Sequence, residues 1–187
     1  MLSGLLWPLI LLAAYAVFVW YLWREAAGMS WARTEAVTTK QPEWTDGAQE
    51  RVLFVCTHNS ARSQIAEALL REAAGTRFVV ASAGTAPTRV HPLAEPVMSE
   101  RGLSLGSHRA KSIAEVGTRW DYVITVCDAA FERCPEFPDK TCRLHWSVED
   151  PLLATGTGLQ QINAFRRVRD DLAERITRWI AEQAEKQ

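Results

Sequence analysis

Apolar residues occur in this chain as one long run near the start and several short runs further on. The long run covers residues 5–23 and contains no charged side chain. The short runs alternate with segments in which apolar residues recur every three or four positions, the spacing of a helix face. Short buried strands that alternate with helices are typical of a parallel sheet covered on both faces. The pattern therefore predicts an α/β domain.

The predicted strands and helices follow one another from about residue 51 to residue 181. Strands are expected at residues 52–55, 78–81, 122–126 and 141–146, and helices at about 60–74, 92–101 and 159–180. In parallel sheets, ligands bind beyond the carboxyl ends of the strands. Cys56 and Cys127 each directly follow a predicted strand, so we expect them to share a site.

The uncharged run at the start predicts a membrane-spanning helix. A helix over residues 1–23 would be about 34 Å long, enough to cross a hydrocarbon core of about 30 Å. The first basic side chains follow this run, so the positive-inside rule places the rest of the chain in the cytoplasm. A buried helix and a cleaved signal peptide are the alternatives. We expect a single-pass protein of the inner (plasma) membrane, with a linker over residues 24–49 and a globular domain over residues 50–187.

Composition narrows the function of this domain. The chain has 21 basic and 22 acidic side chains, and this near balance argues against a partner that is a nucleic acid. Four cysteines in 187 residues do not make a disulfide scaffold. In a reducing compartment they point to redox or metal chemistry, and their spacing lacks the compact pair of a zinc site. We therefore expect no metal and no bound cofactor.

The loop between the first strand and the first helix carries the strongest chemical signal. It reads Cys56-Thr-His-Asn-Ser-Ala-Arg62 and is uncharged until its arginine. Backbone N–H groups of such a loop, together with the start of the next helix, can bind an oxyanion, and an arginine can hold two of its oxygens. The same positive field would stabilise a thiolate at Cys56 as a nucleophile. The candidate oxyanion-binding residues are Thr57, His58, Asn59, Ser60, Ala61, Arg62 and Ser63.

A second segment repeats the spacing of a cysteine followed by an arginine six positions later. It runs from Cys127 to Arg133 and also follows a predicted strand. It contains Asp128 and Glu132, whose negative charges would repel an oxyanion. The spacing alone is therefore weak evidence, and the uncharged composition of the first loop decides between the two segments.

The residues around the first loop resemble a known family. VLFVCTHNSARSQIAEALL (residues 52–70) is similar to the first strand, catalytic loop and first helix of the low-molecular-weight protein tyrosine phosphatase superfamily, and the variant N-S-x-R-S-Q-x-A-E-A is most similar to its arsenate reductase branch. Further segments resemble that branch in the same order, at residues 82–85, 91–113, 126–138, 145–151 and 164–176. The resemblance implies a four-stranded parallel open sheet with helices on both faces. It also implies Cys56 as nucleophile, Arg62 as anion clamp, and Asn59 and Ser63 as supports of the loop.

The other cysteines divide into two groups. With the resemblance, Cys127 and Cys134 suggest a relay: Cys127 attacks the sulfur of Cys56, and Cys134 then takes over the disulfide, which a thioredoxin-like reductant reduces. The two are seven positions apart, too far for a disulfide across an intact helix, so the segment would have to unwind. Unrelated structural thiols are the alternative for this pair. Cys142 alternates with apolar neighbours in the fourth predicted strand, so we expect it in the core.

An acidic residue near the end of the domain completes the candidate site. Asp150 stands before Pro151, at the position that matches the family's general acid. A carboxylic acid there can protonate a leaving oxygen, although capping a helix or a turn is the alternative role.

Three functions fit these features. The first is arsenate reduction by thiols. The second is hydrolysis of phosphoesters, which the first loop alone would support. The third is an oxyanion or redox sensor without enzymatic activity. The extra cysteine pair favours the first, because a phosphatase needs only one thiol.

Overall fold

The computed structural model describes residues 49–185 of the chain. Four parallel strands form one sheet in the order β2-β1-β3-β4. In chain order the elements are β1 (Glu50–Cys56), α2 (Arg62–Ala74), β2 (Phe78–Gly84), α3 (Ala94–Ser99), α4 (Ile113–Val116), β3 (Tyr122–Thr125), α5 (Asp128–Arg133), β4 (Cys142–His145), η1 (Pro151–Leu153) and α6 (Gly158–Ala184). The four-stranded parallel sheet expected from the sequence is confirmed.

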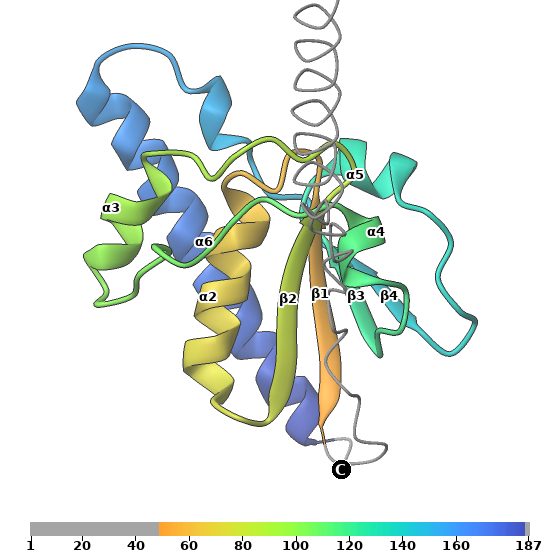
Figure 1. Ribbon diagram of the computed structural model, residues 1–187. Coiled ribbons are helices and arrows are strands. Elements are labelled where there is room, and N and C mark those ends of the chain that lie inside the picture. Colours follow the sequence, from red (N-terminus) through yellow and green to blue (C-terminus); the bar gives the residue numbers. More distant parts are fainter. Residues whose placement is uncertain (1–48, 186–187) are drawn as a thin grey trace, which may run out of the picture. The chain divides into compact units, whose positions relative to one another are not determined.

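Helices cover both faces of the sheet (Figure 1). The helices α2 and α6 pack against each other on one face, and α4 and α5 lie on the other. The inner strand β1 is enclosed on both sides, and Val52, Leu53, Phe54 and Val55 have no exposed surface. This explains why β1 is an unbroken apolar run rather than an alternating one.

Local signals determine where the two long helices begin and end. Gly75 follows α2 with φ of 54°, a backbone conformation that glycine adopts at little cost, and its N–H donates to the carbonyl of Arg71. The helix α6 begins with a capping box, in which Thr157 and Gln160 each accept a hydrogen bond from the other's backbone N–H. Its apolar face then buries Phe165 and other residues against α2.

The expectation that Cys142 is a core residue is wrong. The residue begins β4, which lies at the edge of the sheet and pairs only with β3 among the described strands. Cys142, Arg143 and His145 are all exposed, so the apolar alternation in this strand does not mark a covered face. Edge position, which the sequence pattern does not reveal, accounts for the difference.

The location expected from the start of the chain needs correction. Within residues 49–185, no helix combines the length and the apolar character that crossing a membrane requires. The predicted spanning helix, residues 1–23, and nearly all of the predicted linker lie outside the described residues. The prediction that the protein is located in the inner membrane is therefore wrong.

Candidate active site

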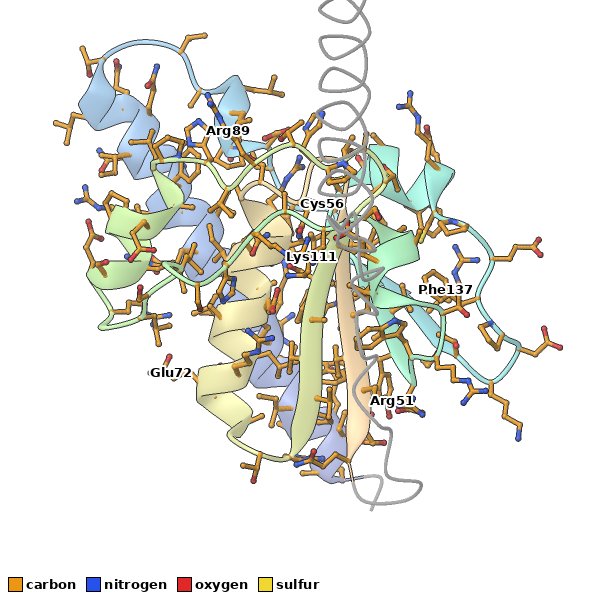
Figure 2. All side chains as sticks on the ribbon, viewed as in Figure 1. Arg51, Cys56, Glu72, Arg89, Lys111 and Phe137 are labelled. Atoms are coloured by element: carbon orange, nitrogen blue, oxygen red, sulfur yellow. The ribbon has the colours of Figure 1, made fainter. Side chains whose placement is uncertain are left out.

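The candidate site lies at the carboxyl ends of the central strands. Figure 2 shows Arg51 and Cys56 at opposite ends of β1, with Cys56 at the end where the loop begins. Cys127 follows the neighbouring strand β3 and begins α5 as its N-terminal cap. Both thiols are buried. The structure brings the two cysteines to the same edge of the sheet, where Cys127 contacts Thr57, the residue that follows Cys56.

The backbone of the loop is turned by the segment that follows β2. The carbonyls of Cys56, Thr57, His58 and Ser60 accept hydrogen bonds from N–H groups of residues 85–91, at 2.8–3.2 Å. Because the C=O and N–H of a trans peptide point in opposite directions, the loop's N–H groups face away from that segment. Loop N–H groups that face one side in this way are the backbone arrangement that can bind an anion.

Two residues allow this curl. Asn59 has φ of 46° and is completely buried. Asparagine adopts this left-handed conformation more readily than most residues. Gly84, at the end of β2, comes so close that an added Cβ would lie 2.8 Å from the carbonyl oxygen of Thr57 and 2.9 Å from the nitrogen of Asn59. The segment at residues 82–85 therefore needs glycine at position 84 for close approach to the loop.

Two hydrogen-bond donors converge on the sulfur of Cys56. The N–H of Asn59 lies 3.1 Å from Sγ, and the Ser63 hydroxyl lies 3.0 Å from it. Ser63 Oγ already accepts a hydrogen bond from the Asn59 amide, so its own proton is available for the sulfur. Both donors are directed at the sulfur that the resemblance implies as the nucleophile.

A buried polar network supports Asn59. Its amide nitrogen donates to Ser63 and Ser82 at 2.8 Å each, and its amide oxygen accepts from Gln64 and from the N–H of Lys111. The four bonds use the full capacity of the side chain, which fixes its orientation.

The network ends in a buried charge. Ser82 also donates to Glu67, whose side chain is 2% exposed and is paired with Arg71 and with Lys111 (labelled in Figure 2). Sequence reasoning missed Gln64, Ser82, Glu67 and Lys111. A signal for Gln64 and Glu67 was present, since both belong to the motif N-S-x-R-S-Q-x-A-E-A that carries the family resemblance.

Arg62 begins α2 and is almost completely buried. Its guanidinium donates to the carbonyl of Val148 at 3.2 Å and to the Asp150 carboxylate at 2.7 Å. The other carboxylate oxygen of Asp150 accepts the N–H of Leu152, so the residue also caps η1. Both roles considered for Asp150, a site residue and a cap, are thus compatible with its contacts.

The second thiol approaches the loop through a side chain. The Sγ of Cys127 lies 3.5 Å from Oγ1 of Thr57, the residue next to Cys56. Cys134 ends α5 and is half-buried, and burial raises the pKa of its thiol while the nearby Arg143 guanidinium opposes that shift. All four cysteines are free thiols. Cys127 therefore contacts the loop that begins at Cys56, whereas Cys134 lies at the other end of α5 and Cys142 at the start of β4.

The predicted loop residues also include His58, Ser60 and Ala61. Ser60 and Ala61 are buried in the curl, whereas the His58 side chain is exposed. Within residues 49–185 no group of three or more His, Cys, Asp and Glu side chains is arranged to hold a metal ion.

The fold and this site define a class of protein: thiol-dependent enzymes in which a loop after a parallel strand binds an oxyanion beside a buried cysteine. Comparison with known proteins identifies the family. Residues 51–187 match the family described as low molecular weight phosphotyrosine protein phosphatase. The chain belongs to this family, as the resemblance in its sequence implied.

Relatives within and around this family have two kinds of named activity. An arsenate reductase of Halalkalibacterium halodurans is 37% identical over 126 residues, which are 67% of this chain and 91% of the relative. A thioredoxin-dependent arsenate reductase of Corynebacterium glutamicum is 30% identical with a TM-score of 0.59, covering 76% of this chain and 66% of that structure. An arginine phosphatase of Geobacillus stearothermophilus is 28% identical with a TM-score of 0.60, covering 74% of this chain and 95% of that structure.

Proposed function

We propose that this chain reduces arsenate to arsenite with its cysteines. The relatives named arsenate reductase confirm the prediction of a thiol-dependent arsenate reductase. The observation that carries the proposal is the position of Cys127, whose sulfur lies against Thr57 at the edge of the oxyanion loop. A phosphatase needs one thiol at this place, whereas a reductase needs a second one within reach of the first.

The loop binds the oxyanion in this proposal. The N–H groups of residues 57–63 surround the arsenate, and the Arg62 guanidinium holds two of its oxygens. In the structure, Arg62 is paired with Asp150 instead. Arsenate would therefore replace the Asp150 carboxylate as the partner of Arg62. The carboxyl group, once released and protonated, would lie beside the leaving oxygen.

Reduction follows in three exchanges of bonds. First, the Cys56 thiolate attacks arsenic and forms an S–As bond, while one oxygen leaves as water with a proton from Asp150. Second, the Cys127 thiolate attacks the Cys56 sulfur, and the S–As bond breaks. Its electron pair stays on arsenic, which goes from As(V) to As(III) and leaves as arsenite. A Cys56–Cys127 disulfide remains.

The third exchange restores the nucleophile. The Cys134 thiolate attacks the sulfur of Cys127, which frees the Cys56 thiolate and leaves a Cys127–Cys134 disulfide. An external dithiol then reduces this bond with two electrons and two protons. We propose a thioredoxin-like protein as that dithiol and no bound cofactor. The name of the Corynebacterium glutamicum relative, a thioredoxin-dependent arsenate reductase, supports this choice.

Replacing Cys134 tests the proposal. The Cys134→Ser variant should lose multiple turnover of arsenate with thioredoxin and thioredoxin reductase, measured by NADPH consumption, because the Cys56–Cys127 disulfide cannot be passed on. It should still release one arsenite per chain and should hydrolyse an aryl phosphate at the wild-type rate. Cys142→Ser, in an exposed thiol outside the site, is the matched control and should leave both activities unchanged.

Hydrolysis of phosphoesters is the second candidate function. It would use only Cys56, Arg62 and Asp150, and both the family and the arginine phosphatase among the solved relatives favour it. If the wild-type chain consumes no reductant with arsenate but cleaves phosphoesters, this second function replaces the first.

We also propose that residues 50–187 form the catalytic domain and residues 24–49 a linker.

A further inference from the structure

The imidazole of His145 contacts α5, the short helix between the two relay cysteines. His145 is the last residue of β4, and α5 begins directly after Cys127 and ends directly before Cys134. The Nε2 atom of His145 lies 3.0 Å from a carboxylate oxygen of Asp128, and the ring lies against that of Phe131 with 4.7 Å between centroids. One side chain from the edge strand thus makes two contacts with the helix.

These two contacts require α5 to be helical. Asp128 and Phe131 are three positions apart, so they lie on the same face of a helix and one above the other. The N–H groups of Ala130 and Phe131 donate to the carbonyl of Cys127, which makes the first turn of this helix. An unwound segment would not keep the carboxylate and the aromatic ring at this spacing, so His145 cannot hold both in that state.

The far side of the imidazole is fixed to the sheet. Its Nδ1 atom lies 2.8 Å from the Thr125 hydroxyl on β3. Hydrogen bonds from Ser147 and from His145 lower the pKa of Asp128, so its carboxylate acts as an acceptor. The imidazole therefore donates from Nε2 to Asp128, and its Nδ1 pairs with the Thr125 hydroxyl, which also contacts the Leu144 carbonyl at 3.3 Å. These bonds on both sides hold the ring in one orientation.

Oxidation of the relay opposes this arrangement. A disulfide needs its two Cα atoms within about 7 Å, whereas residues seven apart in a helix are separated by about 10 Å. Formation of the Cys127–Cys134 bond would therefore unwind α5 and release both contacts with His145. The two contacts stabilise only the dithiol form.

From these contacts we propose that His145 is a positioning residue that clamps α5 in its helical form and thereby sets how readily the Cys127–Cys134 disulfide forms. The inference rests on the relay in the proposed function. In the exchange with an added disulfide, the two thiols lose two protons and two electrons, and the added disulfide leaves as two thiols. Removing the clamp destabilises the dithiol form alone, so it shifts this equilibrium toward the protein disulfide.

The test measures the equilibrium constant of the full chain in mixtures of reduced and oxidised glutathione. Trypsin cuts after Arg133, so the Cys127–Cys134 disulfide joins two peptides that mass spectrometry quantifies after alkylation. We expect His145→Ala to raise the equilibrium constant for the disulfide about fivefold. This is the combined effect of losing one exposed polar pair and one ring contact. Asp128→Asn should favour it about twofold. Glu132→Ala, on an exposed position of α5, is the matched control and should leave the constant unchanged.

A double-variant cycle separates the clamp from a general loss of structure. In the His145→Ala background, Asp128→Asn should have a smaller effect than in the wild type, because the bond to His145 is gone and only the Ser147 bond and the charge at the start of α5 remain to be lost. If His145→Ala does not fold, Asp128→Asn with Phe131→Leu gives the same test from the helix side. A constant that stays at the wild-type value in these variants would overturn the clamp. If the wild-type chain forms no Cys127–Cys134 disulfide at all, the relay itself is wrong and the clamp with it.

Discussion

Two segments of this chain share one spacing and fold in different ways. Both follow a parallel strand, begin with a cysteine and have an arginine six positions later. In the segment from Cys56 to Arg62, four carbonyls accept hydrogen bonds from residues 85–91, so the N–H groups face the other way. In the segment from Cys127 to Arg133, the carbonyls and N–H groups bond within α5. The direction of the backbone, rather than the spacing, makes only one of them suited to bind an oxyanion.

Local sequence explains the two outcomes. Asn59 is the only non-glycine residue with positive φ among residues 49–185, and it breaks the helical path in the first segment. The second segment contains Ala129 and Ala130, which favour a helix, and Asp128 in its first turn, where a negative charge is favourable. The same acidic side chain that stabilises α5 would repel an oxyanion, so helix and anion site exclude each other there.

The largest expected difference between the two segments appears when Arg62 and Arg133 are each replaced by lysine. Arg62→Lys should lower kcat/KM for arsenate by about 100-fold or more, because lysine cannot hold two oxygens at once. Arg133→Lys should change it by less than about twofold, since that arginine ends a helix and lies exposed. Steady-state kinetics of both variants with thioredoxin as reductant provide the measurement. Equal losses in the two variants would show that the second segment also handles the anion.

A second experiment replaces Gly84, which lies against the backbone of the first segment. Gly84→Ala would place a Cβ within 3 Å of the loop backbone, so we expect a loss of about 2 kcal/mol in the free energy of unfolding and a weaker affinity for arsenate. The control is Gly158→Ala at the start of α6, where an added Cβ meets no atom within 4 Å. That variant should change the free energy of unfolding by less than about 0.5 kcal/mol. Urea unfolding followed by circular dichroism measures both, and a Gly84→Ala variant as stable as the control would contradict the close approach.

The parts of the site that follow a strand were predictable from the sequence. Apolar runs mark β1 and β3, and the carboxyl ends of parallel strands meet at one edge, so Cys56 and Cys127 were expected together. The composition between Cys56 and Arg62 also distinguished an uncharged loop from the acidic segment that follows Cys127. These inferences succeed because the information is local: a run, a turn and the residue types within seven positions.

The parts that depend on distant pairing were not predictable from the pattern. The amide of Asn59 bonds to Ser82 and Lys111, which are 23 and 52 positions away, and Arg62 bonds to Asp150 across 88 positions. No periodicity reports such contacts. The exposure of Cys142 has the same origin, since alternation in a strand does not tell whether a further strand or helix covers it.

The smallest expected effect is the pH dependence of the step that joins Cys127 and Cys134, which lie at the two ends of α5. Cys127 lies at the oxyanion loop, whereas Cys134 lies half-buried at the other end of α5, where burial raises its pKa and Arg143 partly opposes the shift. Because the thiolate is the attacking species, a raised pKa leaves most of Cys134 protonated near neutral pH. The step that forms the Cys127–Cys134 disulfide should therefore accelerate about threefold for each half unit of pH until the pH passes that pKa.

Rapid-quench experiments with one equivalent of arsenate can follow this step by peptide mapping at several pH values. Arg143→Gln should slow it near neutral pH, because the Arg143 guanidinium lowers the pKa of Cys134 and its removal leaves the effect of burial unopposed by that charge. The rate at high pH should be unchanged, since Cys134 is then ionised in both proteins. A rate that does not vary with pH would mean that the Cys134 thiolate is already formed. The two ends of α5 would then be equally reactive, and only their distance from the loop would distinguish them.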